Sequence, residues 1–195
     1  MKTAEPIRDK AEIKALTDYF LKKEDLRGYL LITLGIHTAL RISDLLRLRV
    51  SDVYDAESRR ARKSISVKEG KTGKTKIIAL NKKAAAAIEL FVSRTSQAGF
   101  LFKSRKSGAS PEGRPISRVQ AWRVVNAAAA EIKAAARVSC HSLRKTFGYH
   151  AWKNGVSPAV ITEIYNHSSL TVTKRYLGVA QDDKNAAYRT IGTAV

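Results

Sequence analysis

The sequence has one cysteine, few acidic residues and no long hydrophobic run. The single cysteine, Cys140, excludes a disulfide within the chain, which suits a reducing compartment. The longest apolar stretch, residues 29–36, is far shorter than the roughly 20 residues that cross a bilayer. The first ten residues are polar and do not begin a signal peptide. We therefore expect a cytoplasmic protein without a membrane-spanning helix.

The shortage of acidic residues leaves a large positive charge. The 195 residues include 36 lysines and arginines against 17 aspartates and glutamates, a formal net charge of +19. Hydrophobic residues make up 44%, the usual share for a globular domain, so this charge belongs to a folded surface. Such a surface attracts polyanions, and nucleic acid is the default partner. A basic membrane-surface protein or a ribosomal-type protein also fits the composition.

Hydrophobic periodicity predicts a mainly helical chain with one small antiparallel sheet, an α+β fold. Alternating residues at 64–68 and 75–80 flank the turn at 70–74 and predict a β-hairpin, with a third strand near 52–54. Spacings of three and four between apolar residues predict helices. The expected helices cover 10–23, 26–40, a short stretch from 43, 82–97, 117–136, 141–153, 157–165, 169–176 and 183–189, with a loop at 103–115. No repeat or linker divides the chain, so we expect one domain over 1–195.

Two common catalytic arrangements are missing from the sequence. The four histidines, His37, His141, His150 and His167, show no metal-ligand spacing. The run GKTGKT at 70–75 lacks the upstream glycine that a phosphate-binding loop requires. We therefore expect neither a metal site nor nucleotide hydrolysis, and no cofactor.

Two short patterns offer phosphate chemistry without a metal. His141 and Arg144 lie three apart on a predicted helix and would face one site, where the planar arginine fork matches phosphate oxygens. Arg41 and Asp44 repeat this spacing after a long apolar run, where an arginine needs a partner. Each pair also has an ordinary explanation, a surface arginine beside a core histidine in one case and an intrahelical salt bridge in the other.

A third pattern, around Tyr176, combines with the two pairs above into a resemblance to a known protein family. Tyr176 follows His167 by nine residues, which alone would describe a packed tyrosine. Together, TALRISDLLRLRVSDV at 38–53, HSLRKTF at 141–147 and NHSSLTVTKRYLG at 166–178 resemble the three boxes of the tyrosine recombinases, the phage integrase family. The hairpin EGKTGKTKIIAL at 69–80 matches the position of the mobile hairpin that carries the family's lysine.

The resemblance implies the catalytic-domain fold of that family and a role for each matching residue. Arg41 and Arg144 would clamp the scissile phosphate, and Asp44 would hold the geometry around Arg41. His141 would handle the proton of the nucleophile. His167 would hydrogen-bond the phosphate and pack the site.

The nucleophile and the general acid follow from the same resemblance. Tyr176 would attack phosphorus, and Lys71 on the hairpin turn would protonate the leaving 5′-oxygen. Lys74 and Lys76 are alternatives for the hairpin role. Lys71 is preferred because it stands in the Lys-Thr-Gly triplet at the turn, as in many integrases.

The sequence departs from the family pattern at two places. The family usually reads Leu-Gly-His before the tyrosine, whereas Asn166 precedes His167 in this chain. Asparagine tolerates a left-handed backbone, so we expect the turn to survive. The first box often carries a glycine in the region that Thr38 occupies. Neither change removes a catalytic group.

The resemblance implies a site-specific recombinase of the integrase or invertase type, which cleaves and rejoins double-stranded DNA through a 3′-phosphotyrosine. It would assemble as a tetramer on DNA, with no membrane or small-molecule partner. A type IB topoisomerase-like activity and a non-catalytic basic DNA-binding module are the alternatives. A metal-dependent nuclease is disfavoured because no carboxylate cluster is evident.

Arg41 comes after only 40 residues, so the chain is expected to lack the separate core-binding domain of many relatives. It would be either a stand-alone short recombinase, similar to fimbrial invertases, or an excised catalytic domain. Tyr188 and Ile191, beyond the tyrosine box, could anchor the tail on a neighbour or on its own domain.

Overall fold

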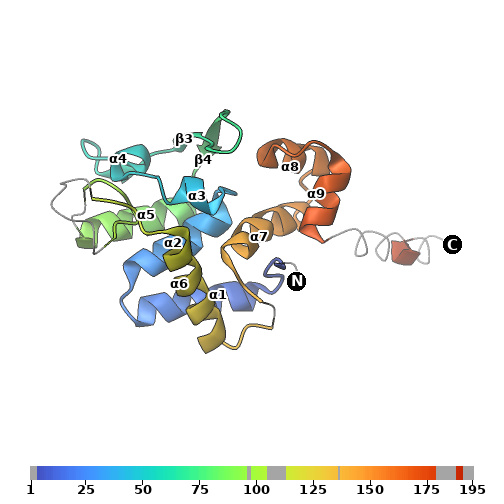
Figure 1. The fold of residues 1–195 in the computed structure, drawn as a ribbon, viewed down its shortest axis with the longest axis horizontal. Helices are drawn as coiled ribbons and strands as arrows, with labels where there is room; N and C mark the ends of the chain where they lie inside the picture. Colours follow the sequence, from blue (N-terminus) through green and yellow to red (C-terminus); the bar gives the residue numbers. More distant parts are fainter. Residues whose placement is uncertain (1–3, 96–97, 105–112, 136, 179–187, 191–195) are drawn as a thin grey trace.

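The computed structural model describes residues 4–95, 98–104, 113–135, 137–178 and 188–190 and is mostly helical, with two small antiparallel sheets (Figure 1). The helices are α1 (Lys10–Lys22), α2 (Leu26–His37), α3 (Ile42–Leu45), α4 (Val50–Val53), α5 (Lys82–Thr95), α6 (Arg118–Glu131), α7 (Cys140–Lys153), α8 (Pro158–Tyr165) and α9 (Leu170–Leu177). The strands are β1 (Tyr54–Asp55), β2 (Arg60–Ala61), β3 (Ser64–Lys68) and β4 (Thr75–Ala79). None of the helices described is long and apolar enough to cross a membrane.

Helix α2 is the centre of the main core. Its sequence is apolar nearly all round, and Leu30, Leu31, Ile32 and Leu34 are all buried. A helix without a polar face must be covered on every side. Helices α1, α5 and α7 pack against it and provide that cover. The predicted buried helix is therefore confirmed, although it ends at His37 and not at residue 40.

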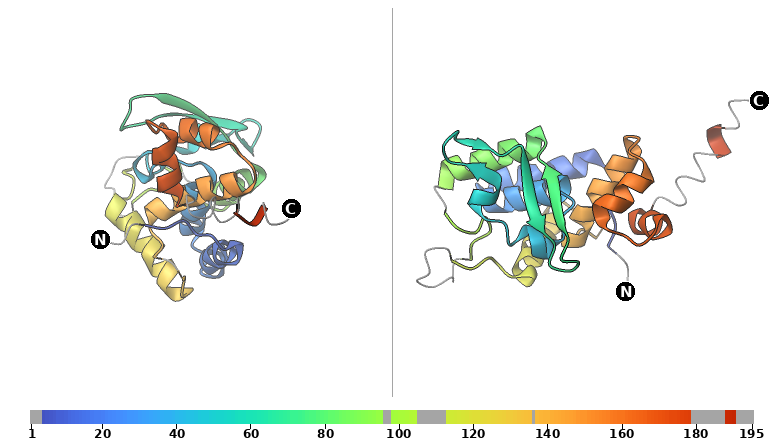
Figure 2. Two further views of the ribbon diagram at one scale, coloured as in Figure 1. Left: turned by 90° about the vertical axis from the view of Figure 1, so that its right-hand side faces the viewer. Right: turned by 90° about the horizontal axis from the view of Figure 1, so that it is seen from above.

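The predicted hairpin is formed by β3 and β4. Ser64 pairs with Ala79 and Lys68 pairs with Thr75, so the two strands match residue for residue. Ile65 and Val67 are buried on the inner face, while their neighbours in the strand are exposed. This alternation fixes which side of the hairpin faces the protein. Figure 2 shows the hairpin lying along one side of the molecule, with its turn directed toward α8 and α9.

The prediction of a third strand at 52–54 was largely wrong. Residues Val50–Val53 form the helical turn α4, and a strand begins only at Tyr54. The Asp52 carboxylate accepts a hydrogen bond from the Arg49 backbone amide at 2.8 Å, which caps the turn as a helix start. The short β1 then pairs with β2 as a second sheet, separate from the hairpin.

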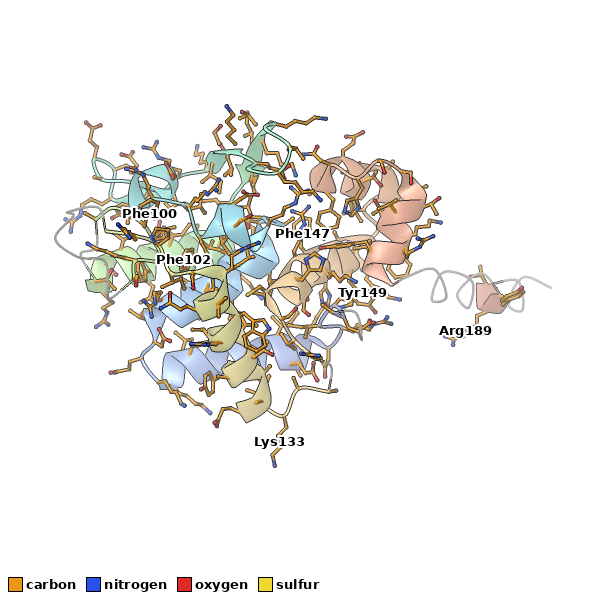
Figure 3. All side chains as sticks on the ribbon, in the orientation of Figure 1. Phe100, Phe102, Lys133, Phe147, Tyr149 and Arg189 are labelled. Atoms are coloured by element: carbon orange, nitrogen blue, oxygen red, sulfur yellow. The ribbon has the colours of Figure 1, made fainter. Side chains whose placement is uncertain are left out.

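A smaller hydrophobic cluster holds the carboxyl-terminal helices together. Its buried residues include Tyr149 on α7, Ile161 and Tyr165 on α8, and Leu177 on α9. Figure 3 labels Tyr149 on the face of α7. Helix α7 therefore joins the two cores, since its Leu143 belongs to the main one. The residues that carry the predicted chemistry lie along this junction.

The remaining helix predictions agree with the structure within a few residues. The helix expected from residue 43 begins at Ile42, and the helix expected over 117–136 ends at Glu131 after a Ser117 cap. An isolated bridge between Lys103 and Pro115 closes the base of the expected loop, whose residues 105–112 lie outside the described part. Of the expected helix at 183–189, only the last two residues are described, and they are helical.

Candidate active site

A cavity of about 840 Å³ opens where the hairpin turn, the start of α3, α7 and the α8–α9 turn meet. Its lining includes all six residues predicted to act on the phosphodiester. They are Arg41, Lys71, His141, Arg144, His167 and Tyr176. The structure therefore brings together side chains that are up to 135 positions apart in the sequence.

Tyr176 lies near the end of α9 in contact with three aromatic rings, those of His141, Tyr165 and His167. The ring centroids of His141 and His167 are 5.0 Å and 4.9 Å from that of Tyr176, and both contacts are edge-on. The tyrosine hydroxyl is buried and has no hydrogen-bond partner of good geometry among the described residues. Burial raises the pKa of this phenol, while the nearby Arg144 charge opposes the rise. The hydroxyl thus has an unused bonding capacity beside a cavity.

Arg144 is held rigidly beneath the cavity. Its side chain donates from Nη1 to the Ala39 carbonyl and from Nη2 to the Tyr165 carbonyl, the latter at 3.1 Å. Its guanidinium also stacks over the Tyr165 ring, 4.5 Å from the centroid. The backbone of Ala39 is left-handed, with φ +55°, next to Thr38, the position where the sequence departs from the family glycine. A buried arginine anchored in this way keeps a fixed charge under the site.

The two histidines of the site are in different surroundings. Nδ1 of His167 lies 3.0 Å from the Thr173 hydroxyl, which fixes its ring on α9. Burial, together with the charges of Arg144 and Arg41, lowers the pKa of His167 to about 4. His141 lies at the exposed edge of the cavity, where partial loss of solvent and the charge of Lys145 lower its pKa. Both rings therefore favour the neutral form near pH 7.

Arg41 does not use the intrahelical partner considered from the sequence. Its Nη1 forms an ion pair with the Glu69 carboxylate at 2.8 Å. Asp44 is buried, and its Oδ1 accepts a hydrogen bond from the Gly70 backbone amide at 3.0 Å. Asp44 therefore ties the first turn of α3 to the hairpin, next to Arg41, which is consistent with the holding role that the resemblance implies.

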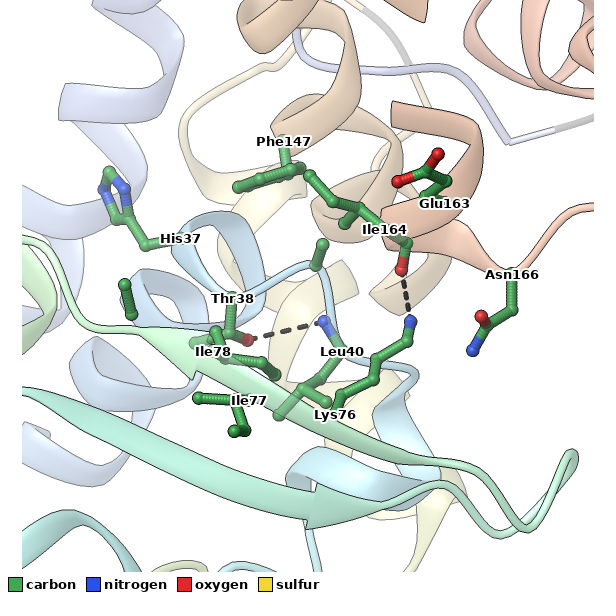
Figure 4. A pocket seen from close by; sticks show the side chains of 12 residues that line it. His37, Thr38, Leu40, Lys76, Ile77, Ile78, Phe147, Glu163, Ile164 and Asn166 are labelled. Atoms are coloured by element: carbon green, nitrogen blue, oxygen red, sulfur yellow. Dashed lines mark hydrogen bonds between the residues drawn. The ribbon is translucent and has the colours of Figure 1, made fainter. Parts of the chain in front are cut away.

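The three hairpin lysines are in three different environments. Lys71 lines the main cavity with Tyr176, whereas Lys74 lines a separate pocket of about 400 Å³ with His167. The ammonium group of Lys76 forms an ion pair with Glu69 at 2.8 Å and donates to the Ile164 carbonyl. Figure 4 shows the contact to Ile164 at the edge of a further cavity of about 410 Å³. Of the three, Lys71 is the one that lines the same cavity as Tyr176.

Sequence reasoning missed Glu69. The alternation of β3, in which Ile65 and Val67 face inward, places residue 69 on the same buried face. A buried carboxylate requires cationic or hydrogen-bonding partners. This combination of strand period and residue type was the signal that could have identified it. Among the described residues there is no cluster of metal-ligating side chains.

Known proteins resemble this chain over most of its length. The model of the phage integrase family matches residues 8–183. The chain is 36% identical over 192 residues to the probable integrase/recombinase YoeC of Bacillus subtilis, covering 98% of this chain and 99% of that protein. The chain spans just over half the length of several longer relatives. One of them is the tyrosine recombinase XerD of Corynebacterium glutamicum, which is 28% identical over 85% of this chain and 52% of that protein.

Solved structures share the fold. The crystal structure of the XerA recombinase superposes with a TM-score of 0.74 at 22% identity, covering 97% of this chain and 66% of that one. The XerH recombinase bound to a palindromic difH substrate, in a post-cleavage complex, gives 0.68 at 19% identity, covering 95% of this chain and 53% of that one. The expected α+β fold of a tyrosine recombinase catalytic domain is thereby confirmed.

Proposed function

The chain belongs to the phage integrase family of site-specific tyrosine recombinases, and we propose that it cleaves and rejoins double-stranded DNA through a 3′-phosphotyrosine. The observation that carries this proposal is the buried hydroxyl of Tyr176, which has no hydrogen-bond partner of good geometry in the described part of the chain and lies with two arginines and two histidines at one cavity. This set matches a phosphodiester under attack, because it combines a nucleophile with positive groups for the phosphate oxygens.

Tyr176 is the proposed nucleophile. Its oxygen forms a bond to the scissile phosphorus, and the bond between phosphorus and the 5′-oxygen breaks. The phenol must lose its proton in this step, and burial makes that loss harder by raising the pKa. A neutral His141, whose ring lies edge-on to the tyrosine, is the proposed acceptor of that proton.

Arg41, Arg144 and His167 are the proposed phosphate-binding groups. Charge on the equatorial oxygens increases in the transition state, and fixed donors stabilise it without reorganisation. The anchored guanidinium of Arg144 is suited to this role. In His167 the Nδ1 atom is engaged by Thr173, so Nε2 of the neutral ring is the atom assigned to the phosphate.

Lys71 is the proposed general acid. It gives a proton to the departing 5′-oxygen, so that a 5′-hydroxyl leaves. The energy of the broken bond is retained in the phosphotyrosine, and no nucleotide cofactor is consumed. Attack by a 5′-hydroxyl from a partner strand then reverses each step, releases Tyr176 and joins the new strands.

Duplex DNA is the proposed substrate. The charge of +19 suits an extended contact with phosphates, and a neighbour of the same fold, the Tn1549 transposon integrase, is described as a complex with circular intermediate DNA. Exchange between two duplexes requires four strand cleavages, so we also propose assembly of a tetramer on DNA. A DNA substrate is consistent with the cytoplasmic location expected from the sequence.

The test needs no knowledge of the target sequence. We would incubate the protein with nicked duplexes of randomised sequence, denature the mixture, and isolate DNA that stays covalently attached. The nick lets a short strand diffuse away after cleavage and traps the adduct. We expect adducts with one cleavage sequence for the wild type and none for Tyr176→Phe. Tyr188→Phe is the control, because this ring is 78% exposed and outside the site. An adduct in Tyr176→Phe would remove the nucleophile assignment.

The two alternatives give different results. A non-catalytic DNA-binding module would bind the duplexes and form no adduct. A type IB topoisomerase-like enzyme would form the adduct and relax a supercoiled plasmid, but would not exchange strands between two plasmids that carry the captured sequence. We expect exchange between the two plasmids, which only the recombinase assignment predicts.

A further inference from the structure

Glu69 is a buried carboxylate next to the candidate active site that binds several side chains at once. Its side chain is 0% exposed. Oε1 forms ion pairs with Arg41 and Lys76, each at 2.8 Å. Oε2 accepts hydrogen bonds from the hydroxyl of Thr72 and from Nδ2 of Asn166, again at 2.8 Å each. One side chain therefore contacts four others.

These four partners come from three separate segments of the chain. Arg41 precedes α3, Thr72 and Lys76 belong to the hairpin, and Asn166 ends α8. Within the residues described, the hydrogen bonds that join the hairpin to the end of α8 are those of Glu69 with Asn166 and of Lys76 with the Ile164 carbonyl. Glu69 thus connects the first arginine, the hairpin and the turn that carries His167.

The position of Lys71 depends on the same contacts. The amide of Gly70 is bound by Asp44, and the side chain of Thr72 is bound by Glu69, so both neighbours of Lys71 are anchored. The Gly73 amide also donates to the Glu69 carbonyl at 2.9 Å. A lysine side chain is long, but its reach toward one atom depends on where its backbone is held.

Asn166 gives an independent reason to regard this link as specific. Its backbone is left-handed, with φ +51° and ψ +45°, as expected for the position where the family usually has glycine. A glycine would satisfy that backbone but would have no amide for Glu69. The asparagine and the glutamate therefore form a matched pair, and the departure from the family pattern brings an added contact.

The contacts require a charged carboxylate. Burial alone would raise the pKa of Glu69, but Lys76, Asn166, Thr72 and Arg41 together lower it to about 2. At neutral pH the group is therefore ionised and balances two cations that would otherwise repel each other. A glutamine of the same shape would keep some hydrogen bonds but leave Arg41 and Lys76 without their counter-charge.

We propose that Glu69 is a positioning residue of the strand-cleavage reaction, which holds Arg41 and the Lys71 turn in register with Tyr176 through its contacts to Lys76, Thr72 and Asn166. This inference rests on the proposed function. Glu69 touches neither the phosphate nor the nucleophile in this scheme, and its effect reaches the reaction through the two cationic groups that it places.

The test is single-turnover cleavage by Glu69→Gln on two forms of a nicked duplex that the wild type cleaves. One form has the natural phosphodiester, and the other has sulfur in place of the 5′-bridging oxygen. Sulfur leaves without a proton from Lys71. We expect Glu69→Gln to be slower by about a hundredfold on the natural substrate, because a displaced catalytic group loses about that factor. On the sulfur substrate we expect the part of the loss that arises from Lys71 to disappear, while the part that arises from Arg41 remains.

The ratio of the cleavage rates on the two substrates distinguishes a loss of positioning from a loss of protein stability. A variant that is partly unfolded has fewer active molecules and loses the same factor on both substrates. Glu163→Gln is the matched control, since it makes the same charge change at an exposed side chain on α8. Its ratio should equal that of the wild type. Asn166→Gly, which keeps the backbone and removes the amide, should change the ratio in the direction of Glu69→Gln by a smaller factor.

If Glu69→Gln does not fold, Glu69→Gln combined with Lys76→Met removes one anion and one cation, so the net charge of the cluster stays as in the wild type. We expect this pair to fold and still to show the partial sulfur rescue, since a neutral glutamine holds Thr72 and Arg41 less firmly than the carboxylate does. If the variant that folds has the same ratio of cleavage rates on the two substrates as the wild type, the proposal is wrong, while the recombinase assignment stands. Absence of cleavage by the wild type itself would instead count against the proposed function.

Discussion

Arg144 and Tyr165 exchange two hydrogen bonds. Nη2 of Arg144 donates to the Tyr165 carbonyl at 3.1 Å, and the Tyr165 hydroxyl donates to the Arg144 carbonyl at 2.5 Å. The first bond closes the end of α8, and the second reaches back to the backbone of α7. The guanidinium that is proposed to bind phosphate is thus locked between two helices by the ring on which it stacks.

This pairing predicts the behaviour of Tyr165→Phe. The variant loses the hydroxyl bond but keeps the ring, so we expect a decrease of about 1 kcal/mol in the free energy of unfolding. Arg144 keeps its bonds to the two carbonyls, so the covalent DNA adduct should still form. Urea denaturation and the adduct assay check the two parts. Loss of the adduct in Tyr165→Phe would mean that the hydroxyl acts in the reaction, contrary to the assignment of Tyr176.

Lys71 and Arg144, two of the cationic groups that line the cavity, should respond differently to the leaving group. Lys71→Ala removes the proposed general acid, so a 5′-bridging sulfur should restore its cleavage rate. Arg144→Ala removes stabilisation of the phosphate charge, a loss of about 3 kcal/mol that sulfur cannot repair. Single-turnover rates on both substrates measure the difference. Equal rescue of the two variants, or rescue of Lys74→Ala alone, would show that another residue is the acid.

The pH dependence of stability should reflect the buried histidines. Burial lowers the pKa of His37 to about 4 from its ordinary 6.5. Between these values the unfolded chain binds a proton that the native protein does not, so stability is complete above pH 6.5 and falls as the pH drops toward 4. His37→Gln should weaken this decline by about 2 kcal/mol between pH 7 and 5. Urea denaturation at both pH values gives the numbers, and an unchanged decline in the variant would contradict the assignment.

Salt should weaken DNA binding steeply. Each phosphate neutralised releases counterions, so the logarithm of affinity should fall linearly with the logarithm of salt, with a slope of about −0.9 per phosphate. The slope can be measured by fluorescence anisotropy on a labelled duplex. Affinity without salt dependence would exclude duplex DNA as the partner.

Assembly on DNA can be tested with the same assay. If neighbouring protomers contact each other on DNA, a duplex with two adjacent sites should bind more tightly than a single half-site at equal salt, since linked contacts raise the effective concentration. Equal affinity for the two duplexes would argue against cooperative assembly.

Much of the fold follows from local patterns in the sequence. The apolar run of α2, the alternation of β3 and the proline that begins α8 each specify an element through interactions within a few residues. The resemblance to the recombinase boxes also named the six cavity residues before any geometry was available. Their grouping at one cavity agrees with that expectation, while their individual roles remain predictions.

The sequence did not determine which charged groups pair. Arg41 has Asp44 three residues away, yet its ion-pair partner is Glu69. Lys76, on the same hairpin as Lys71, also forms an ion pair with Glu69. A local pattern can specify helix and strand because their hydrogen bonds join near neighbours. Ion pairs between distant segments depend on how the hairpin packs against α8, and only the tertiary structure decides that packing.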